Sequence, residues 1–298
     1  MGSVGAHLGP GWQEHADPAW LAGWEPRRFE LAGGTTEVVA MGAGAPLLLV
    51  PPLPGFKEAY LACARPLAAR FRVVTFDLRA RFDGRARWAA LLDDLDRVAA
   101  AWAPGAAGVV GHSLGGALAQ RWAARHPGRV RALVLSSSFA RVPAARGHRW
   151  ARYVEQPLVL AGLRWLPAGA ALALGRRLAA RGGWVFDPRC EGPVLALMRH
   201  GIRHVSLRLA LDRVRLAFEY DGRAELPRIA APALILVGER ESAPALAAAA
   251  ELERLIPGAE RRVSPGAGHL HPLSHPEWFA RAIAEFALPR LGGAAGAP

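Results

Sequence analysis

Short apolar runs of the kind that forms buried strands recur along this chain and alternate with segments of helical character. Continuous apolar runs are typical of parallel strands that are covered on both faces, and the helical segments between them supply the crossover connections. The alternation therefore predicts an α/β fold with a mostly parallel, twisted sheet and helices on both faces. The runs are PLLLVPP at 46–52, FRVVTFDL at 71–78, AGVVGHS at 107–113, VRALVLSSS at 130–138 and PALILVGE at 232–239.

The outer strands and the connecting helices have their own signals. RRFELA and TEVVAMG predict a hairpin that turns across Gly33 and Gly34, and ERRVSPG at 260–266 predicts a weaker last strand. Between the strands, residues 87–103 place apolar side chains at helical spacing, which leaves Asp93, Asp94 and Asp96 as a solvated helix face. Two more helices are predicted, one that stops before Pro127 and one that begins at Pro276.

The alternation breaks between about residues 139 and 228, where the chain is rich in Arg, Leu and Trp and has helical character. Because this segment lies between two core strands, it predicts a helical cap over the sheet. The predicted organisation is an N-terminal extension (1–26), an α/β core (27–138 and 229–290), the cap (139–228) and a flexible tail (291–298). The cap aromatics either line an acyl pocket or form the cap's own core; they are Trp150, Tyr153, Trp165, Trp184 and Phe186.

The segment VVGHSLGGALAQ at 109–120 has the form G-x-S-x-G and lies between a predicted strand and a predicted helix. A tight strand-to-helix turn strains the central serine, and only small neighbours let the flanking backbones pass. The Ser113 hydroxyl would then project beyond the sheet, with the N–H of Leu114 directed toward an oxyanion on the substrate. The context predicts a nucleophile at Ser113, because a strained serine has no purely structural use there.

A serine nucleophile needs a base, and the base needs a carboxylate that fixes its tautomer. His269 follows the last predicted strand, in GAGHLHPLSHP, and Glu241 follows the strand before it, in GERESAP. The order serine, acid, histidine is that of α/β-hydrolases. Glu239 is a rival for the acid, since it lies nearer the strand end, whereas LVLSSSF holds no acidic residue at all.

On these three motifs, GHSLGG, GERES and GAGHLHPLSHP, the chain resembles the α/β-hydrolase fold superfamily over nearly its whole length. The resemblance implies that Ser113 is the nucleophile, His269 the general base and acid, and Glu241 the orienting acid. It also implies cleavage of an ester, thioester, amide or lactone through an acyl-enzyme, without a cofactor. Serine at the nucleophile position argues against the dehalogenases and epoxide hydrolases of this fold, which use aspartate.

The chain departs from the family pattern in two places. The family usually has His-Gly after its third strand, whereas this chain has two prolines followed by Leu53, which by position would supply the second oxyanion N–H. The acid is glutamate, where aspartate is commoner. The stretches LVPPLPG and LVLSSSF are also similar to maspardin and its relatives, which implies a non-catalytic protein-interaction module as the alternative function. A cofactor-free haloperoxidase or an acyltransferase with the same triad is a third reading.

Other polar residues near these motifs are predicted to be structural. His271 and His275 lack the carboxylate or cysteine partners of a metal site, so they are expected to be surface or loop histidines, and no metal is predicted. His112 is expected to pack or hydrogen-bond beside the nucleophile, and Asp77 to hold the loop that follows it.

The formal net charge of +12 does not predict nucleic-acid binding, because the basic residues are spread along the chain without aromatic-interleaved clusters. We expect a small acyl substrate as the partner. The two cysteines, Cys63 and Cys190, make no disulfide framework, and the N-terminus has no signal-peptide pattern, which together predict a cytoplasmic protein. The apolar stretch at 157–175 contains Arg164 and Pro167, so we expect a buried helical pair and no stable membrane insertion.

Overall fold

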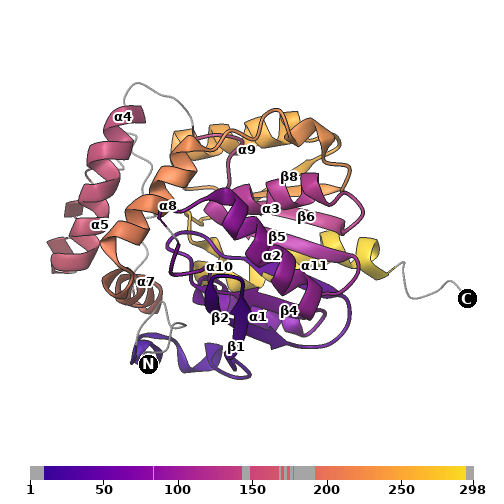
Figure 1. The fold of residues 1–298 in the computed structure, drawn as a ribbon, viewed down its shortest axis with the longest axis horizontal. Coiled ribbons are helices and arrows are strands. Elements are labelled where there is room, and N and C mark those ends of the chain that lie inside the picture. The colour runs from indigo at the N-terminus through magenta and orange to yellow at the C-terminus, as the bar shows by residue number, and fades with distance from the viewer. Residues whose placement is uncertain are drawn as a thin grey trace, which may run out of the picture.

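The computed structural model describes residues 10–82, 84–142, 148–167, 169–170, 173–174, 177 and 192–292. Among these residues the strands form a single eight-stranded sheet in the order β1-β2-β4-β3-β5-β6-β7-β8 (Figure 1). The pairs β1–β2 and β2–β4 are antiparallel and all the others are parallel, which confirms the predicted α/β fold class. The strands are β1 Arg27–Leu31, β2 Gly34–Met41, β3 Pro46–Val50, β4 Arg72–Phe76, β5 Ala107–His112, β6 Val130–Ser136, β7 Ala233–Gly238 and β8 Glu260–Ser264.

The central strands are buried on both faces, as their continuous apolar runs predict. Leu48 packs in a core layer with the helices α2 (Trp88–Trp102), α3 (Leu114–Arg125) and α9 (Ala243–Leu255). Its neighbour Leu47 packs on the opposite layer, with α1 (Leu61–Ala68) and α11 (Pro276–Leu291). Successive side chains of a strand point to opposite faces, so each core strand needs apolar residues at every position.

The first hairpin and the helix α2 each differ from the sequence prediction in one detail. Leu31 pairs with Gly34, so the turn consists of Ala32 and Gly33, and Gly34 already belongs to β2. The predicted solvated face of α2 is wrong for Asp94, which is buried and accepts two hydrogen bonds from Arg79 at 2.5 and 2.6 Å. A buried carboxylate is tolerated when a guanidinium binds it in this two-point geometry.

Helices occupy the described part of the segment between β6 and β7, on one side of the sheet (Figure 1). The limits of the predicted cap at 139 and 228 stay a prediction. The chain there forms α4 (His148–Trp150), the π-helical turn η4 (Ala151–Glu155), α5 (Gln156–Trp165), α7 (Pro193–His204) and α8 (Leu207–Glu219), with the short helix η5 (Leu226–Arg228) before β7. None of the helices, in the described ranges, is long and apolar enough to cross a membrane.

The predicted burial of the cap aromatics is wrong for the three that the structure describes. Trp150, Tyr153 and Trp165 are 60%, 62% and 64% exposed, and an arginine lies over the ring of two of them, Arg152 over Tyr153 and Arg164 over Trp165. Amphipathic rings with a cation over one face can remain at a surface. Trp184 and Phe186 lie outside the described residues.

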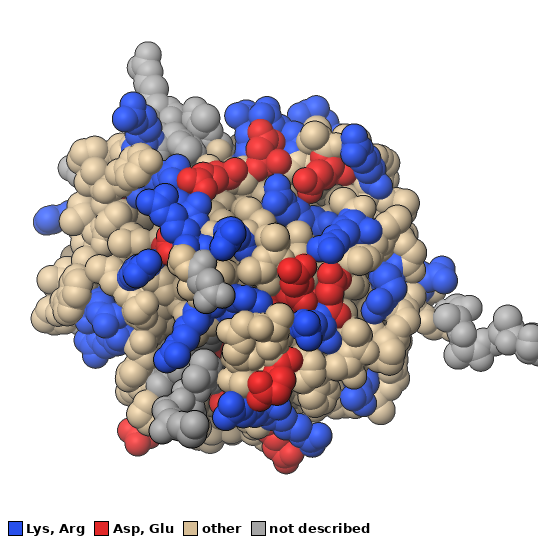
Figure 2. All heavy atoms as spheres, in the orientation of Figure 1, with Lys and Arg blue, Asp and Glu red and all other residues tan. Residues whose placement is uncertain are grey.

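The described part of the N-terminal extension contains two short helices, η1 (Trp12–His15) and η2 (Pro18–Trp20), and packs Trp12 and Trp24 into a core cluster with α1 and α7. Of the predicted tail, residues 293–298 lie outside the described part, and α11 continues to Leu291. The remaining short helices, η3 (Lys57–Tyr60) and α10 (His271–Ser274), both border the candidate site. Figure 2 shows basic side chains spread over the face in view, with acidic side chains between them.

Candidate active site

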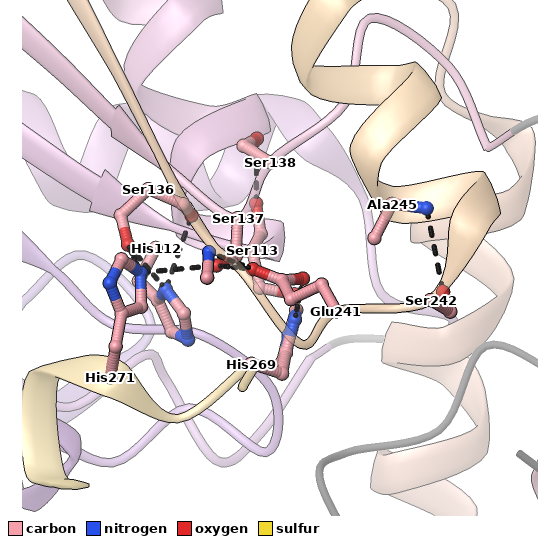
Figure 3. A network of polar contacts seen from close by, with 11 residues as sticks. His112, Ser113, Ser136, Ser137, Ser138, Glu241, Ser242, Ala245, His269 and His271 are labelled. Atoms are coloured by element: carbon pink, nitrogen blue, oxygen red, sulfur yellow. Dashed lines mark hydrogen bonds and ion pairs between the residues drawn. The ribbon is translucent and has the colours of Figure 1, made fainter. Parts of the chain in front are cut away.

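Three of the predicted residues lie at the carboxyl ends of parallel strands in the same half of the sheet. Ser113 directly follows β5, Glu241 follows β7 and His269 follows β8. In an open parallel sheet this edge is the usual place for a ligand site, because the loops that leave the strands converge there. Figure 3 shows these side chains together with three serines from the end of β6.

Ser113 sits on a strained turn between β5 and α3. Its φ of 53° and ψ of −118° are values that side-chain-bearing residues rarely adopt. The turn is tight enough to require glycine on both sides: a Cβ on Gly111 would come within 2.6 Å of the Gly116 Cα, and one on Gly115 would meet the carbonyl oxygens of Val50 and Pro51. The G-x-S-x-G spacing is therefore a packing requirement of this turn.

Glu241 and His269 form a hydrogen-bonded pair. The His269 Nδ1 lies 3.0 Å from Glu241 Oε2, and the Glu241 side chain is only 1% exposed. Its other oxygen, Oε1, accepts hydrogen bonds from the Gly238 N–H at 3.0 Å and from the Ser137 hydroxyl at 2.5 Å. Burial alone would raise the Glu241 pKa, but the neighbouring His269, with His271 and the Ser137 hydroxyl, lowers it to about 2, so the carboxylate is ionised at neutral pH.

The rival acid, Glu239, makes a different contact. Its exposed side chain accepts a hydrogen bond from the Gly266 N–H at 2.6 Å. Glu241 thus contacts His269, while Glu239 fixes the turn that follows β8.

His271 departs from the expectation of a surface or loop histidine, which is wrong for this residue. It is fully buried, and its Nε2 lies 2.7 Å from Ser136 Oγ and 3.1 Å from Ser137 Oγ. Burial lowers its pKa to about 4 despite the nearby Glu241 carboxylate, with the rings of His269 and His275 adding to the fall. His275 is partly buried, and its Nδ1 lies 2.9 Å from Ser274 Oγ. Within the described ranges no three His, Cys, Asp or Glu residues are grouped as metal ligands.

His112 is buried beside the nucleophile and hydrogen-bonds through Nδ1 to Ser136, at 3.1 Å from its carbonyl oxygen and 2.9 Å from its Oγ. Burial lowers the His112 pKa well below its usual range, and the neighbouring His269 and His271 lower it further. A neutral imidazole, hydrogen-bonded through Nδ1, therefore packs beneath the turn that carries Ser113.

The buried His271 leads to a prediction about pH and stability. The His271 pKa is about 4 in the folded protein and 6.5 in the unfolded chain. Between these pH values the imidazole is protonated in the unfolded chain and neutral in the folded protein. The free energy of unfolding is therefore expected to fall as the pH drops from 6.5 to 4, with about 3 kcal/mol attributable to His271. Urea denaturation at several pH values should show a flatter dependence in His271→Gln; an unchanged slope would contradict the assignment.

The loop after β3 carries the predicted second oxyanion donor, Leu53, and a buried ion cluster holds this loop in place. Asp77 accepts a hydrogen bond from the Lys57 N–H at 2.9 Å and lies 3.2 Å from Lys57 Nζ. The ammonium group also contacts Glu37 and Glu58, each at 2.8 Å. Asp77 thus has a structural role. The role of Lys57 was not predicted from the sequence, although Lys57 is the only lysine in the chain and stands out for that reason.

A largely apolar cavity of about 160 Å³ opens between the sheet edge and the cap, with Ser113 and His269 in its wall. Leu53 lines it too, and Leu114, the first residue of α3, has an N–H without a partner inside the helix. None of its lining residues in the described chain carries a charged carboxylate, ammonium or guanidinium group. The rest of the wall is Pro54, Phe139, Val142, Gln156, Val159, Leu160, Met198, Ile202, Ala210, Val214, Ala217, Phe218 and Leu270.

Comparison with known proteins identifies the family. The model of the α/β hydrolase fold family matches residues 45–276, which is most of the chain. The chain belongs to the α/β hydrolase family. Membership confirms the predicted superfamily and places the protein among hydrolytic enzymes. The solved structure of a putative lipase from Acinetobacter baumannii shares this fold, with a TM-score of 0.73 at 22% identity over 95% of this chain and 96% of its own.

Two curated relatives of this α/β hydrolase carry the same name, pimeloyl-[acyl-carrier protein] methyl ester esterase. The protein from Chromobacterium violaceum is 32% identical over 74% of this chain and 86% of its own length. That from Nitrosomonas europaea is 31% identical over 72% of this chain and 84% of its own length.

Proposed function

We propose that this α/β hydrolase is a serine esterase that uses Ser113, His269 and Glu241 to cleave a carboxylic ester through an acyl-enzyme. The observation that carries the proposal is the hydrogen bond of Glu241 to His269, whose ring lines the same cavity as the strained Ser113. The alternatives of a thioester or a lactone substrate remain within the same mechanism.

The proposed reaction follows from the positions of these groups. The Ser113 Oγ attacks the ester carbonyl carbon while His269 Nε2 takes the hydroxyl proton, and the Glu241 carboxylate stabilises the imidazolium through Nδ1. The N–H groups of Leu114 and Leu53 donate to the oxyanion. Collapse breaks the ester bond, and the departing alcohol receives the proton from His269. Water then attacks the acyl-enzyme by the same steps, which regenerates the Ser113 hydroxyl.

For the substrate we infer an uncharged methyl ester of an acyl chain. The described wall of the cavity is apolar and uncharged, which suits a hydrocarbon chain, whereas a carboxylate would find no charged partner among these described residues. The relatives named as methyl ester esterases of an acyl-carrier-protein-linked chain support this class. A chain that reaches the cavity from a carrier would enter with its methyl ester first and leave the carrier outside.

A pair of matched substrates tests this proposal. Dimethyl pimelate and monomethyl pimelate differ only in that the second has a free carboxylate at one end. We expect kcat/KM for the dimethyl ester to exceed that for the monomethyl ester by about 100-fold, since leaving a charge unpaired in an apolar site costs several kcal/mol. The methanol released reports both reactions. Equal rates would contradict the inferred cavity specificity, and a thioester or lactone cleaved faster than both would replace the substrate class.

A cavity-filling variant gives a further prediction. Ala217 lies in the cavity wall on α8, and Ala217→Leu adds three carbon atoms to the space for the acyl chain. We expect kcat/KM for long-chain methyl esters to fall by about tenfold or more, because overpacking costs 1–3 kcal/mol. Methyl acetate hydrolysis, which needs only the catalytic end of the cavity, serves as the internal control and should be unchanged. A uniform loss across chain lengths would place Ala217 outside the acyl path.

A further inference from the structure

The end of β6 carries a run of three buried serines that the proposed reaction does not use: Ser136, Ser137 and Ser138. Ser137 has a φ of 47°, and among the non-glycine residues in the described ranges only Ser113 shares a positive φ. Its N–H donates to the Leu236 carbonyl on β7 at 2.8 Å, which ties the turn to the strand that leads to Glu241. Backbone strain of this kind persists only where the surrounding structure holds it, and it is concentrated at functional sites.

The strained conformation directs the Ser137 hydroxyl between two groups. Its Oγ lies 2.5 Å from Glu241 Oε1 and 3.1 Å from His271 Nε2 (Figure 3). Ser137 is 2% exposed and His271 is fully buried, so water does not compete for either contact. Neither residue belongs to the wall of the cavity.

His271, Ser137 and Glu241 form a row of hydrogen-bonded side chains. The proton in each of these hydrogen bonds can be assigned from the chemistry of the groups. An ionised Glu241 can only accept, so the single hydroxyl proton of Ser137 goes to Glu241 Oε1. The Ser137 oxygen is then left to accept from His271, which requires the proton of the neutral His271 ring on Nε2. This N–H is shared between Ser137 Oγ at 3.1 Å and Ser136 Oγ at 2.7 Å. In this tautomer His271 Nδ1 carries no proton, which agrees with its lack of a hydrogen-bond partner among the described residues. The row therefore runs from His271 through Ser137 to Glu241, whose second oxygen accepts from His269.

We propose that Ser137 and His271 are positioning residues that hold the Glu241 carboxylate for His269. The inference rests on the proposed function and deepens it. Glutamate has one more rotatable bond than aspartate, so its carboxylate needs more restraint to present a single oxygen to the base. Ser137 and the Gly238 N–H together fix Oε1, which leaves Oε2 for His269. Hydrogen bonds in such a buried row also polarise one another.

Kinetics of Ser137→Ala test the role of the hydroxyl. Alanine removes the hydroxyl and keeps a side chain of similar size on the same backbone. We expect kcat for a methyl ester to fall by about 10- to 100-fold, as for the loss of a hydrogen bond to a charged group, with KM unchanged because Ser137 does not line the cavity. In a Glu241→Ala background the same substitution should cost nothing more, whereas a purely structural serine would lower kcat equally in both backgrounds.

Two further variants separate positioning from folding. Ser242→Ala is the matched control: Ser242 adjoins Glu241, but its hydroxyl caps α9 through the Ala245 N–H (Figure 3). It should lower the melting temperature and leave kcat unchanged. His271→Gln keeps a donor N–H in the pocket and His271→Leu does not, so the glutamine variant should retain more activity than the leucine variant. Equal loss in both would overturn the role of His271.

The His269 Nδ1 proton supplies a readout that does not depend on turnover. In the native protein this proton, held between an imidazole and a buried carboxylate, should give a far-downfield proton NMR resonance. In Ser137→Ala the resonance should shift or broaden, while in Ser242→Ala it should stay in place. An unmoved resonance together with an unchanged kcat would overturn the inference. A native protein that shows the resonance and cleaves no ester would instead refute the proposed function and leave the positioning row intact.

Discussion

Ser113→Ala is expected to lower kcat for methyl ester hydrolysis by about 10⁴- to 10⁶-fold, the scale seen when a triad serine is removed. The Ser113 hydroxyl is the only protein group in the proposed reaction that forms a bond to the acyl carbon, so no neighbouring side chain is expected to replace it. Alanine occupies the strained turn as serine does, and circular dichroism and the melting temperature should show a folded protein. Methanol release under single-turnover conditions measures the chemical step directly.

His269→Ala provides the companion result for the base. When two residues act in the same catalytic step, removing either one removes the contribution of both. The double variant Ser113→Ala/His269→Ala should therefore be no slower than the slower single variant. Losses that multiply in the double variant would show that the two residues act independently. A Ser113→Ala protein that keeps kcat near the native value would remove the acyl-enzyme from the mechanism.

Glu241→Ala is expected to lower kcat by about 10³- to 10⁴-fold, less than the loss of serine, because the histidine can still act as a base in the wrong orientation. The buried carboxylate holds the Nδ1 proton of His269 and stabilises the imidazolium that forms during attack. With it removed, the imidazole is free to rotate and to adopt the other tautomer. The rate of acyl-enzyme formation measured by stopped-flow checks this step.

Glu239→Ala is the matched control for that prediction. Glu239 lies two residues away and has the same charge, but its contact is the Gly266 N–H at the turn after β8. We expect kcat to be unchanged and stability to fall slightly. If Glu239→Ala lost activity and Glu241→Ala did not, the acid would have to be reassigned to Glu239.

The sequence predicts the sheet, and it places the three candidate site residues at strand ends, because both follow from local rules. Continuous apolar runs require burial on both faces, and the strained turn at Ser113 requires glycine at 111 and 115. Strand order then brings Glu241 and His269 to the same edge. The choice of Glu241 over Glu239 stays a prediction, now supported by the hydrogen bond to His269.

Buried polar residues are less predictable, because what buries them lies far away in the chain. His271 hydrogen-bonds to Ser136 and Ser137, which lie more than 130 residues earlier in the chain, and no local sequence pattern predicts that contact. Asp94, on the helix α2, is likewise buried against Arg79, which reaches it from the loop after β4. A periodicity rule assigns charged side chains to the solvent, and it fails where a distant partner satisfies them.

The prediction that the cap aromatics are buried is wrong for a different reason. Trp150, Tyr153 and Trp165 are large and apolar, so composition favours burial, yet the cavity wall takes smaller residues of α5 such as Val159 and Leu160. Which face of a cap helix meets the core depends on how the whole segment docks. Helical spacing alone does not determine that orientation.

Labelling with a fluorophosphonate, followed by intact-protein mass spectrometry, tests the central claim most directly, since the probe reacts only with an activated serine and needs no knowledge of the substrate. The account predicts one adduct on the native protein and on Glu239→Ala, located at Ser113, none on Ser113→Ala, and strongly slowed labelling of His269→Ala and Glu241→Ala. A folded native protein that takes up no probe would contradict the account and favour the non-catalytic interaction module. Labelling that persists in Ser113→Ala would contradict it too, because the activated residue would then lie elsewhere.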